Sequence, residues 1–136
     1  MSEENNLEIV RQVYEAAARR DTATILTLYD PEVELDASAL GVEGPGGDIF
    51  RGHEGLRSLF GEWHESWGEI EYDYEELIDA GDQVISVATR HARGRASGVE
   101  VEQRFALLWT IREGKVIRVV WFLDRNEALK STEWRE

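Results

Sequence analysis

Two ionisable side chains lie at positions where a protein can arrange proton transfer. Asp36 ends the segment EVELD, where a strand pattern runs into a glycine-rich loop, and His91 lies inside the strand pattern VATRHARGR. A carboxylate at the mouth of an apolar pocket can act as a general base, and histidine is the usual acid/base group near neutral pH. Both residues are therefore candidates for the proton-transferring group of an active site.

The alternation of side chains along a strand bears directly on Asp36. In EVELD, Val33 and Leu35 share one face, which puts Asp36 on the other face with the two glutamates. In a regular strand whose apolar side faces the core, Asp36 points away from the pocket. Only a bend or a bulge beside the glycine-rich loop turns it inward. An ordinary solvated carboxylate is thus the competing interpretation, and the strand phase favours it.

His91 and Gln103 are polar residues in strand patterns that are otherwise apolar on one face. His91 is in phase with Ile85, Val87 and Thr89. A hydrogen-bonded histidine of the core or of an interface is the competing interpretation for His91. On the next strand Gln103 interrupts an apolar series, which consists of Val101, Phe105, Leu107, Trp109 and Ile111. Gln103 is therefore a candidate for orienting a bound ligand.

The spacing of the three histidines argues against a metal site. His53 and His64 would share one helix face, but about 16 Å would separate them along the helix axis, too far for one ion. The chain has no cysteine, which excludes disulfides, thiolate zinc sites and thiol nucleophiles. We therefore expect no metal and no cofactor.

Helical periodicity predicts three helices before most of the strands. They cover NNLEIVRQVYEAAARR (5–20), TATILTLY (22–29) and the segment from His53 to Trp67, which carries a stripe of apolar and aromatic residues. A short strand, EVELD (32–36), follows the second helix. The segment ASALGVEGPGGDIFRG (37–52) then predicts a long loop, of the kind that often forms a lid or a pocket rim.

The period changes from 3.6 to 2 after Trp67, and four long strand patterns follow. They are EIEYDYEELI (69–78), VISVATRHARGR (84–95), VEVEQRFALLWTI (99–111) and VIRVVWFLD (116–124). Short turns of this kind join antiparallel neighbours. We therefore predict one α+β domain over residues 1–136, with the helices packed on the concave face of a curved, mainly antiparallel sheet. Such a sheet forms a cone whose open end is a natural pocket.

The last strand pattern is apolar on both faces. One face has Ile117, Val119, Trp121 and Leu123, and the other has Val116, Arg118, Val120 and Phe122, so both faces are largely apolar. Because the predicted helices can cover only one face, we expect the other face to bind a second copy, giving a homodimer through the sheet.

Charge and composition restrict the partners. Among the 136 residues, 28 are acidic and 15 are basic, and the net charge of −13 repels polyanions. We therefore expect no nucleic acid and no anionic membrane surface as a partner. The first residues contain no apolar signal core and no segment is long and apolar enough to span a membrane, so the expected location is cytoplasmic.

The sequence resembles the SnoaL-like polyketide cyclase family, within the superfamily of nuclear transport factor 2 and ketosteroid isomerase. The resemblance rests on VRQVYEAAARRDTATILTLYDPEVELDA, FRGHEGLRSLF, AGDQVI and VEVEQRFALLWTIREGKVIRVVWFLDRNEAL, which together span nearly the whole chain. The superfamily includes isomerases, aldol cyclases, dehydratases, epoxide hydrolases and proteins without catalysis. The resemblance therefore implies the cone-shaped fold and leaves the reaction open.

The ketosteroid isomerase pattern is only partly present. Tyr14 lies where the resemblance implies the helical tyrosine, and Asp36 lies near the implied position of the base. The strand position implied for the oxyanion-stabilising acid falls on Leu107 or Ala106. Without that acid, an enolate would depend on Tyr14 alone, so steroid-type isomerisation is not expected.

The combined expectation is a protein that binds a small, largely apolar or polyketide-like molecule in the cone. A catalytic version would carry out cofactor-free isomerisation, cyclisation or dehydration, with Asp36 or His91 transferring the proton, Tyr14 polarising an oxygen and Gln103 orienting the ligand. The alternative is a non-catalytic ligand-binding or dimerisation module. The residues expected to line the cavity are Phe60, Trp63, Leu107, Trp109 and Trp121.

Overall fold

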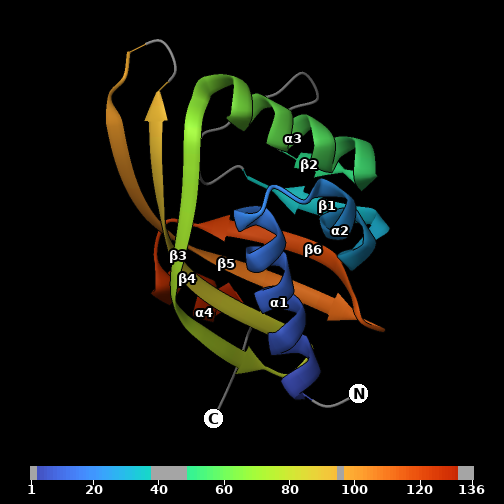
Figure 1. Cartoon of the computed structure of the whole chain (residues 1–136). Helices are drawn as coiled ribbons and strands as arrows, with labels where there is room; N and C mark the ends of the chain where they lie inside the picture. Colours follow the sequence, from blue (N-terminus) through green and yellow to red (C-terminus); the bar gives the residue numbers. More distant parts are fainter. Residues whose placement is uncertain (1–2, 38–48, 95–96, 132–136) are drawn as a thin grey trace.

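The computed structural model describes residues 3–37, 49–94 and 97–131 (Figure 1), with the side chains of all these except residues 3–5, 60–70 and 72. The helices are α1 (Glu3–Ala18), α2 (Thr22–Leu28), α3 (Gly52–Ser66) and α4 (Arg125–Ser131). The strands are β1 (Tyr29–Asp36), β2 (Ile49–Arg51), β3 (Trp67–Ala80), β4 (Gln83–Gly94), β5 (Glu100–Arg112) and β6 (Lys115–Phe122). None of the helices in the described ranges is long and apolar enough to cross a membrane.

The strands form a six-stranded sheet in the order β2-β1-β6-β5-β4-β3. All neighbours are antiparallel except β1 and β6, which run parallel. The predicted α+β class and the meander from β3 to β6 are confirmed. Three assignments differ in type. Ile49–Arg51 pairs with β1 as a strand, although we assigned it to the loop, and Trp67 begins β3, although we placed it at the end of the third helix. Tyr29 begins β1, although we placed it at the end of the second helix. Residues 38–48 of the predicted loop lie outside the described residues.

The sheet has an inner face covered by α1, α2 and α3, and an outer face that carries α4 (Figure 1). A large apolar cluster joins the inner face to the three helices. The members of this cluster include Val13, Ile25 and Leu56 from the helices. They also include Leu35 and Trp109 from the sheet. The helices therefore pack on the inner face through the apolar stripes that we predicted.

A smaller apolar cluster on the outer face corrects our argument for a dimer. It consists of Ile85, Ala106, Leu108 and Ala128, with Ile78, Val120, Phe122 and Leu129 packed against it. Because α4 supplies Ala128 and Leu129, it covers part of this outer face without a second subunit, and Val120 and Phe122 are left partly buried. Val116 was also placed on the wrong face: the register shifts between Thr110 and Ile111, and Val116 is buried in the inner cluster. The homodimer itself stays a prediction.

Asp21 is the N-cap residue of the short helix α2, and its ionisation makes the stability of the protein depend on pH. Its carboxylate accepts hydrogen bonds from the backbone N–H of Thr24, at 3.1 Å, and from the Thr24 hydroxyl, at 2.6 Å. These bonds, the side-chain one foremost, lower the pKa of Asp21 below its usual value of 3.8. A pKa that is lower in the folded state gives stabilisation that is complete above the unfolded-state pKa and disappears as the pH falls through the folded-state pKa.

We therefore predict that Asp21→Asn, which keeps an oxygen acceptor but cannot ionise, is less stable than the wild type at neutral pH. The difference in the free energy of unfolding should shrink as the pH falls from about 6 to about 2, because the carboxylate becomes protonated over that range. Urea unfolding at a series of pH values measures the difference. A gap of constant size at every pH would contradict the prediction.

Candidate functional site

A chain of three hydrogen-bonded side chains crosses the inner face. Tyr14, half-buried on α1, has its Oη 2.8 Å from Oγ of Ser86 on β4. Trp109 on β5 donates its indole N–H to the same Ser86 oxygen at 2.9 Å. Ser86 is completely buried and Trp109 nearly so. Two hydroxyl groups and one indole N–H are therefore linked in largely apolar surroundings, where hydrogen bonds are stronger than in water.

Aromatic rings surround the Tyr14 end of this chain. The Tyr14 ring lies 4.9 Å from the ring of Tyr74 and 6.0 Å from that of Trp109, centroid to centroid. Tyr29 packs edge-on against Trp109 at 6.4 Å. Tyr74 is 39% exposed, so this aromatic group reaches the surface. The surroundings suit a molecule with flat apolar parts.

Arg90 is the second polar feature of the inner face. It is only 8% exposed and donates a hydrogen bond to the side-chain oxygen of Gln103, its cross-strand neighbour on β5. Its guanidinium carbon lies 5.9 Å from the centre of the Phe105 ring, within the range of a cation–π contact. The sequence singled out Gln103, and the structure places a buried positive charge beside it.

Several of the predicted ligand-binding residues gather on this face. Leu107, Trp109 and Trp121 are buried in the inner cluster, and Gln103 is half-buried on the same face of β5. The side chains of Phe60 and Trp63 lie outside the described ones. Tyr14 and Gln103 thus belong to one face of the sheet, which is the arrangement a shared ligand site requires.

Asp36 lies on the other side of the sheet. In the parallel pairing of β1 with β6, Leu35 is opposite Val119, a member of the inner cluster, and Asp36 is opposite Val120, which packs in the outer one. Asp36 therefore shares the outer face with Glu34, which pairs with Arg51 and Arg118. The strand phase that argued against a catalytic Asp36 holds in the structure.

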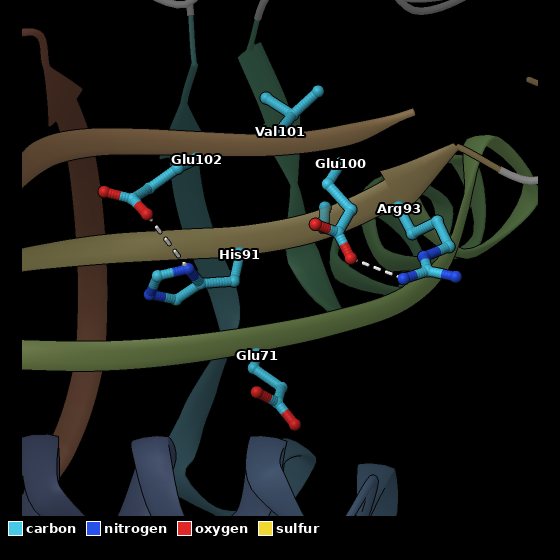
Figure 2. A pocket seen from close by; sticks show the side chains of 7 residues that line it. Glu71, His91, Arg93, Glu100, Val101 and Glu102 are labelled. Atoms are coloured by element: carbon cyan, nitrogen blue, oxygen red, sulfur yellow. Dashed lines mark hydrogen bonds and ion pairs between the residues drawn. The ribbon is translucent and has the colours of Figure 1, made fainter. Parts of the chain in front are cut away.

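His91 also lies on the outer face, between two carboxylates. Its Nε2 is 3.2 Å from Asp73 on β3. Its Nδ1 is 3.5 Å from Glu102 on β5, a contact that Figure 2 shows. The side chain is 40% exposed and borders an open pocket of about 420 Å³ among charged residues that include Glu71 and Arg93. We correctly predicted that His91 and Ile85 share a face of β4. That face packs against α4, however, and the three N-terminal helices cover the opposite face. His91 and Tyr14 therefore do not share a site.

The chemistry available on the inner face is hydrogen bonding to oxygen. Among the described residues, the buried polar or charged ones are Ser86 and Arg90. Neither is a base at neutral pH. In the same part of the chain, no group of three histidine or acidic side chains is arranged to hold a metal ion. The inner face can therefore orient and polarise a ligand, with a hydroxyl at one place and a guanidinium at another.

Ser86 and Arg90 are the residues that the sequence interpretation missed. They belong to the alternating set Val84, Ser86, Ala88, Arg90 and Ala92. This set is less aliphatic than the set on the opposite face of the strand, which includes Ile85 and Val87, so the sequence did not indicate that it faces the core. The available signal is size: small residues on one strand can oppose large aromatics on the next, as Ala88 opposes Phe105.

Comparisons with known proteins agree with this fold. Uncharacterized protein Rv0034 of Mycobacterium tuberculosis is 26% identical over 132 residues, which are 96% of this chain and 98% of that protein. The crystal structure of TerC co-crystallised with polyporic acid is 26% identical, covers 96% of this chain and 97% of its own, and has a TM-score of 0.78. A nuclear transport factor 2-like protein of Burkholderia thailandensis is 27% identical, with 95% coverage of both chains and a TM-score of 0.75.

The model of the SnoaL-like domain family matches residues 10–119, from the middle of α1 to the last strand. This range includes Tyr14, Ser86, Arg90, Gln103 and Trp109. By this match the chain belongs to the SnoaL-like family.

Proposed function

We propose that the protein binds a small, largely apolar molecule on the inner face of the sheet, with Tyr14 as the hydrogen-bond donor to an oxygen of that molecule. The observation that carries the proposal is the buried chain of Trp109, Ser86 and Tyr14. Ser86 is completely buried and Tyr14 is half-buried beside aromatic rings, so a ligand oxygen that accepts from Tyr14 would form its hydrogen bond in apolar surroundings.

The direction of the hydrogen bonds supports a donor role for Tyr14. An indole N–H can only donate, so the Ser86 oxygen accepts from Trp109. Either hydroxyl can donate in the 2.8 Å contact between Ser86 and Tyr14, and in the arrangement proposed here Ser86 donates, which leaves the phenol proton of Tyr14 for a ligand oxygen. Successive hydrogen bonds of this kind strengthen one another. A carbonyl or phenol oxygen of a ligand would receive the last bond of the chain.

TerC supports the choice of a small organic ligand. That protein, whose structure is similar over nearly the whole chain, was crystallised with polyporic acid. The 26% identity and the TM-score of 0.78 indicate that the two chains share their fold, which supports the same kind of ligand for this chain. A family resemblance to polyketide cyclases points to the same class of compound.

Binding, and not acid/base catalysis by Asp36 or His91, is the function proposed. Isomerisation, cyclisation and dehydration each need a base that reaches the ligand. Asp36 and His91 both lie on the outer face, opposite Tyr14. Among the described side chains the inner face supplies donors but no buried carboxylate or imidazole. The ligand is therefore held and polarised there, with no proton removed by either predicted base.

Tyr14→Phe and Asp36→Asn together test this proposal. Loss of one hydrogen bond should lower the affinity for polyporic acid by about twofold to tenfold in Tyr14→Phe. Asp36→Asn, on the outer face, should leave the affinity unchanged. Isothermal titration calorimetry with the two variants and the wild type measures both. An equal or larger loss in Asp36→Asn would contradict the site, and a wild type that binds neither polyporic acid nor any of a panel of planar aromatic compounds would overturn the function.

A further inference from the structure

We infer that the ring of Tyr74 covers Tyr14, and that a ligand reaches the Tyr14 hydroxyl by displacing this ring toward the edge of the sheet. The inference rests on the proposed function and deepens it, because it names the residue at which a ligand enters the same site. The observations that carry it are the contact between the two rings, the exposure of Tyr74 and its place on an edge strand.

The Tyr14 hydroxyl lies at the buried end of an aromatic cluster that reaches the surface at Tyr74. Its hydrogen-bond partner Ser86 is completely buried, and Trp109, the next residue in that chain of hydrogen bonds, is nearly so. The Tyr74 ring lies 4.9 Å from the Tyr14 ring, centroid to centroid, with 35° between the two planes, yet Tyr74 is exposed. A molecule that approaches Tyr14 from solvent at this point therefore meets the Tyr74 ring first.

The place of Tyr74 in the sheet gives its ring room to move. The strand β3 is at the edge of the sheet, so within the described sheet Tyr74 has a cross-strand neighbour on one side only (Figure 1). That neighbour is Ala88, whose side chain is a single methyl group. Cross-strand pairs of large side chains stabilise one another, and Ala88 offers Tyr74 little of this kind. The ring can therefore swing toward the open edge without displacing a large side chain of β4.

The backbone beside Tyr74 is held from the outer face, so the motion is a rotation of the side chain. The register of β3 with β4 shifts between Tyr74 and Glu76, as in a β-bulge. Glu75 pairs with Arg104 at 3.2 Å and Glu76 pairs with Arg125 at 2.8 Å, both on the outer face. Bulges often aim a side chain beside a binding site. Exposed side chains change rotamer within nanoseconds, so the open fraction determines how fast Tyr14 is reached.

The contact between the two rings sets the size of the effect. A pair of aromatic rings favours the closed position over a position without the contact by about twofold to tenfold. Access to Tyr14 is reduced by the fraction of molecules that are closed. Removal of the Tyr74 ring leaves Tyr14 accessible at all times, so the rate at which a reagent reaches it should rise about threefold to tenfold.

Acetylation by N-acetylimidazole measures this access without a ligand. The reagent transfers its acetyl group to the phenol oxygen of tyrosine, and the leaving imidazole takes up the phenol proton. Peptide mass spectrometry then gives the initial rate at Tyr14. Tyr74→Ala should raise this rate about threefold to tenfold over that of the wild type. Tyr74→Phe keeps the ring and should leave the rate unchanged. Tyr74→Val, whose side chain suits a strand, serves as a second ring-free variant.

Two controls separate the loss of a covering ring from a general loosening of the structure. Asp73→Ala changes the preceding residue of β3, which is 78% exposed and contacts His91 on the outer face, and should leave the rate at Tyr14 unchanged. Tyr29 is buried against Trp109, and its rate should stay low in every variant. The inference is overturned by an unchanged rate at Tyr14 in Tyr74→Ala and Tyr74→Val, or by a rise at Tyr29 as large as that at Tyr14.

A second measurement connects access to binding. The association rate constant of polyporic acid, followed by stopped-flow tryptophan fluorescence, should rise in Tyr74→Ala by the same factor as the acetylation rate. An unchanged association rate in a variant with faster acetylation would mean that the ligand enters elsewhere, which overturns the entry role of Tyr74 and leaves ligand binding intact. A wild type that binds no tested compound counts against the proposed function alone, because acetylation still decides whether Tyr74 covers Tyr14.

Discussion

Replacing Ser86 with alanine is expected to lower the free energy of unfolding by about 1–3 kcal/mol, because the indole N–H of Trp109 loses its acceptor in a buried position. Ser86 is 0% exposed and Trp109 is 2% exposed, so water has little access to the orphaned donor. Trp109→Phe removes the donor itself. In the double variant, Ser86→Ala should therefore cost much less than it does alone.

Urea unfolding of the wild type, both single variants and the double variant, followed by far-ultraviolet circular dichroism, measures this coupling. Thr89→Ala is the matched control. Thr89 is on the same strand, but its hydroxyl donates to Glu75 at an exposed position on the outer face, and its removal should cost no more than about 0.5 kcal/mol. Costs for Ser86→Ala and Trp109→Phe that simply add, or an effect of Ser86→Ala as small as that of Thr89→Ala, would disprove a coupled pair.

The elements could be predicted from local patterns because each pattern is a consequence of local geometry. Leu7, Val10 and Tyr14 recur at the period of a helix, and the residues of β3 alternate at the period of a strand. Asp21 accepts the capping bond that its position indicated. The parallel pairing of β1 with β6 could not be predicted in this way. It joins segments more than eighty residues apart, and no local sequence pattern indicates which distant strand a segment pairs with.

The faces could be predicted only in part. Alternation tells which residues share a face, and it correctly grouped Asp36 with Glu34 and His91 with Ile85. It does not tell which of the two faces the long helices cover. On β4 the more aliphatic set lies under the short helix α4, and the set with Ser86 faces α1, so aliphatic content alone indicated the wrong face.

Irregular pairing accounts for the remaining difference. The register between β5 and β6 shifts at Thr110, which turns Val116 to the inner face with Val119. A one-residue shift reverses the face of every residue beyond it, and no feature of the segment VIRVV marks where the shift occurs. The strand β1, in contrast, alternates regularly between buried and partly buried residues from Val33 to Asp36, and this regularity is what places Asp36 away from the inner face.

The phase of β1 leads to the prediction with the largest expected effect on stability. Leu35 is completely buried, pairs with Phe50 on one side and Val119 on the other, and belongs to the inner cluster. Leu35→Ala should lower the free energy of unfolding by about 2–5 kcal/mol, through lost apolar burial and the cavity left behind. The midpoint of urea unfolding should fall while its slope stays the same.

Glu34→Ala, one residue away, is the matched comparison because it changes the opposite face of the same strand. Glu34 forms partly exposed ion pairs with Arg51, at 3.5 Å, and Arg118, at 3.2 Å. Pairs of this kind contribute about 0–1 kcal/mol, so Glu34→Ala should cost far less than Leu35→Ala. Equal costs would mean that β1 does not present alternate faces to the core and to the surface. In that case Asp36, which shares the face of Glu34, would not be confined to the outer face. Acid/base catalysis with Tyr14 on the inner face would then be the better hypothesis.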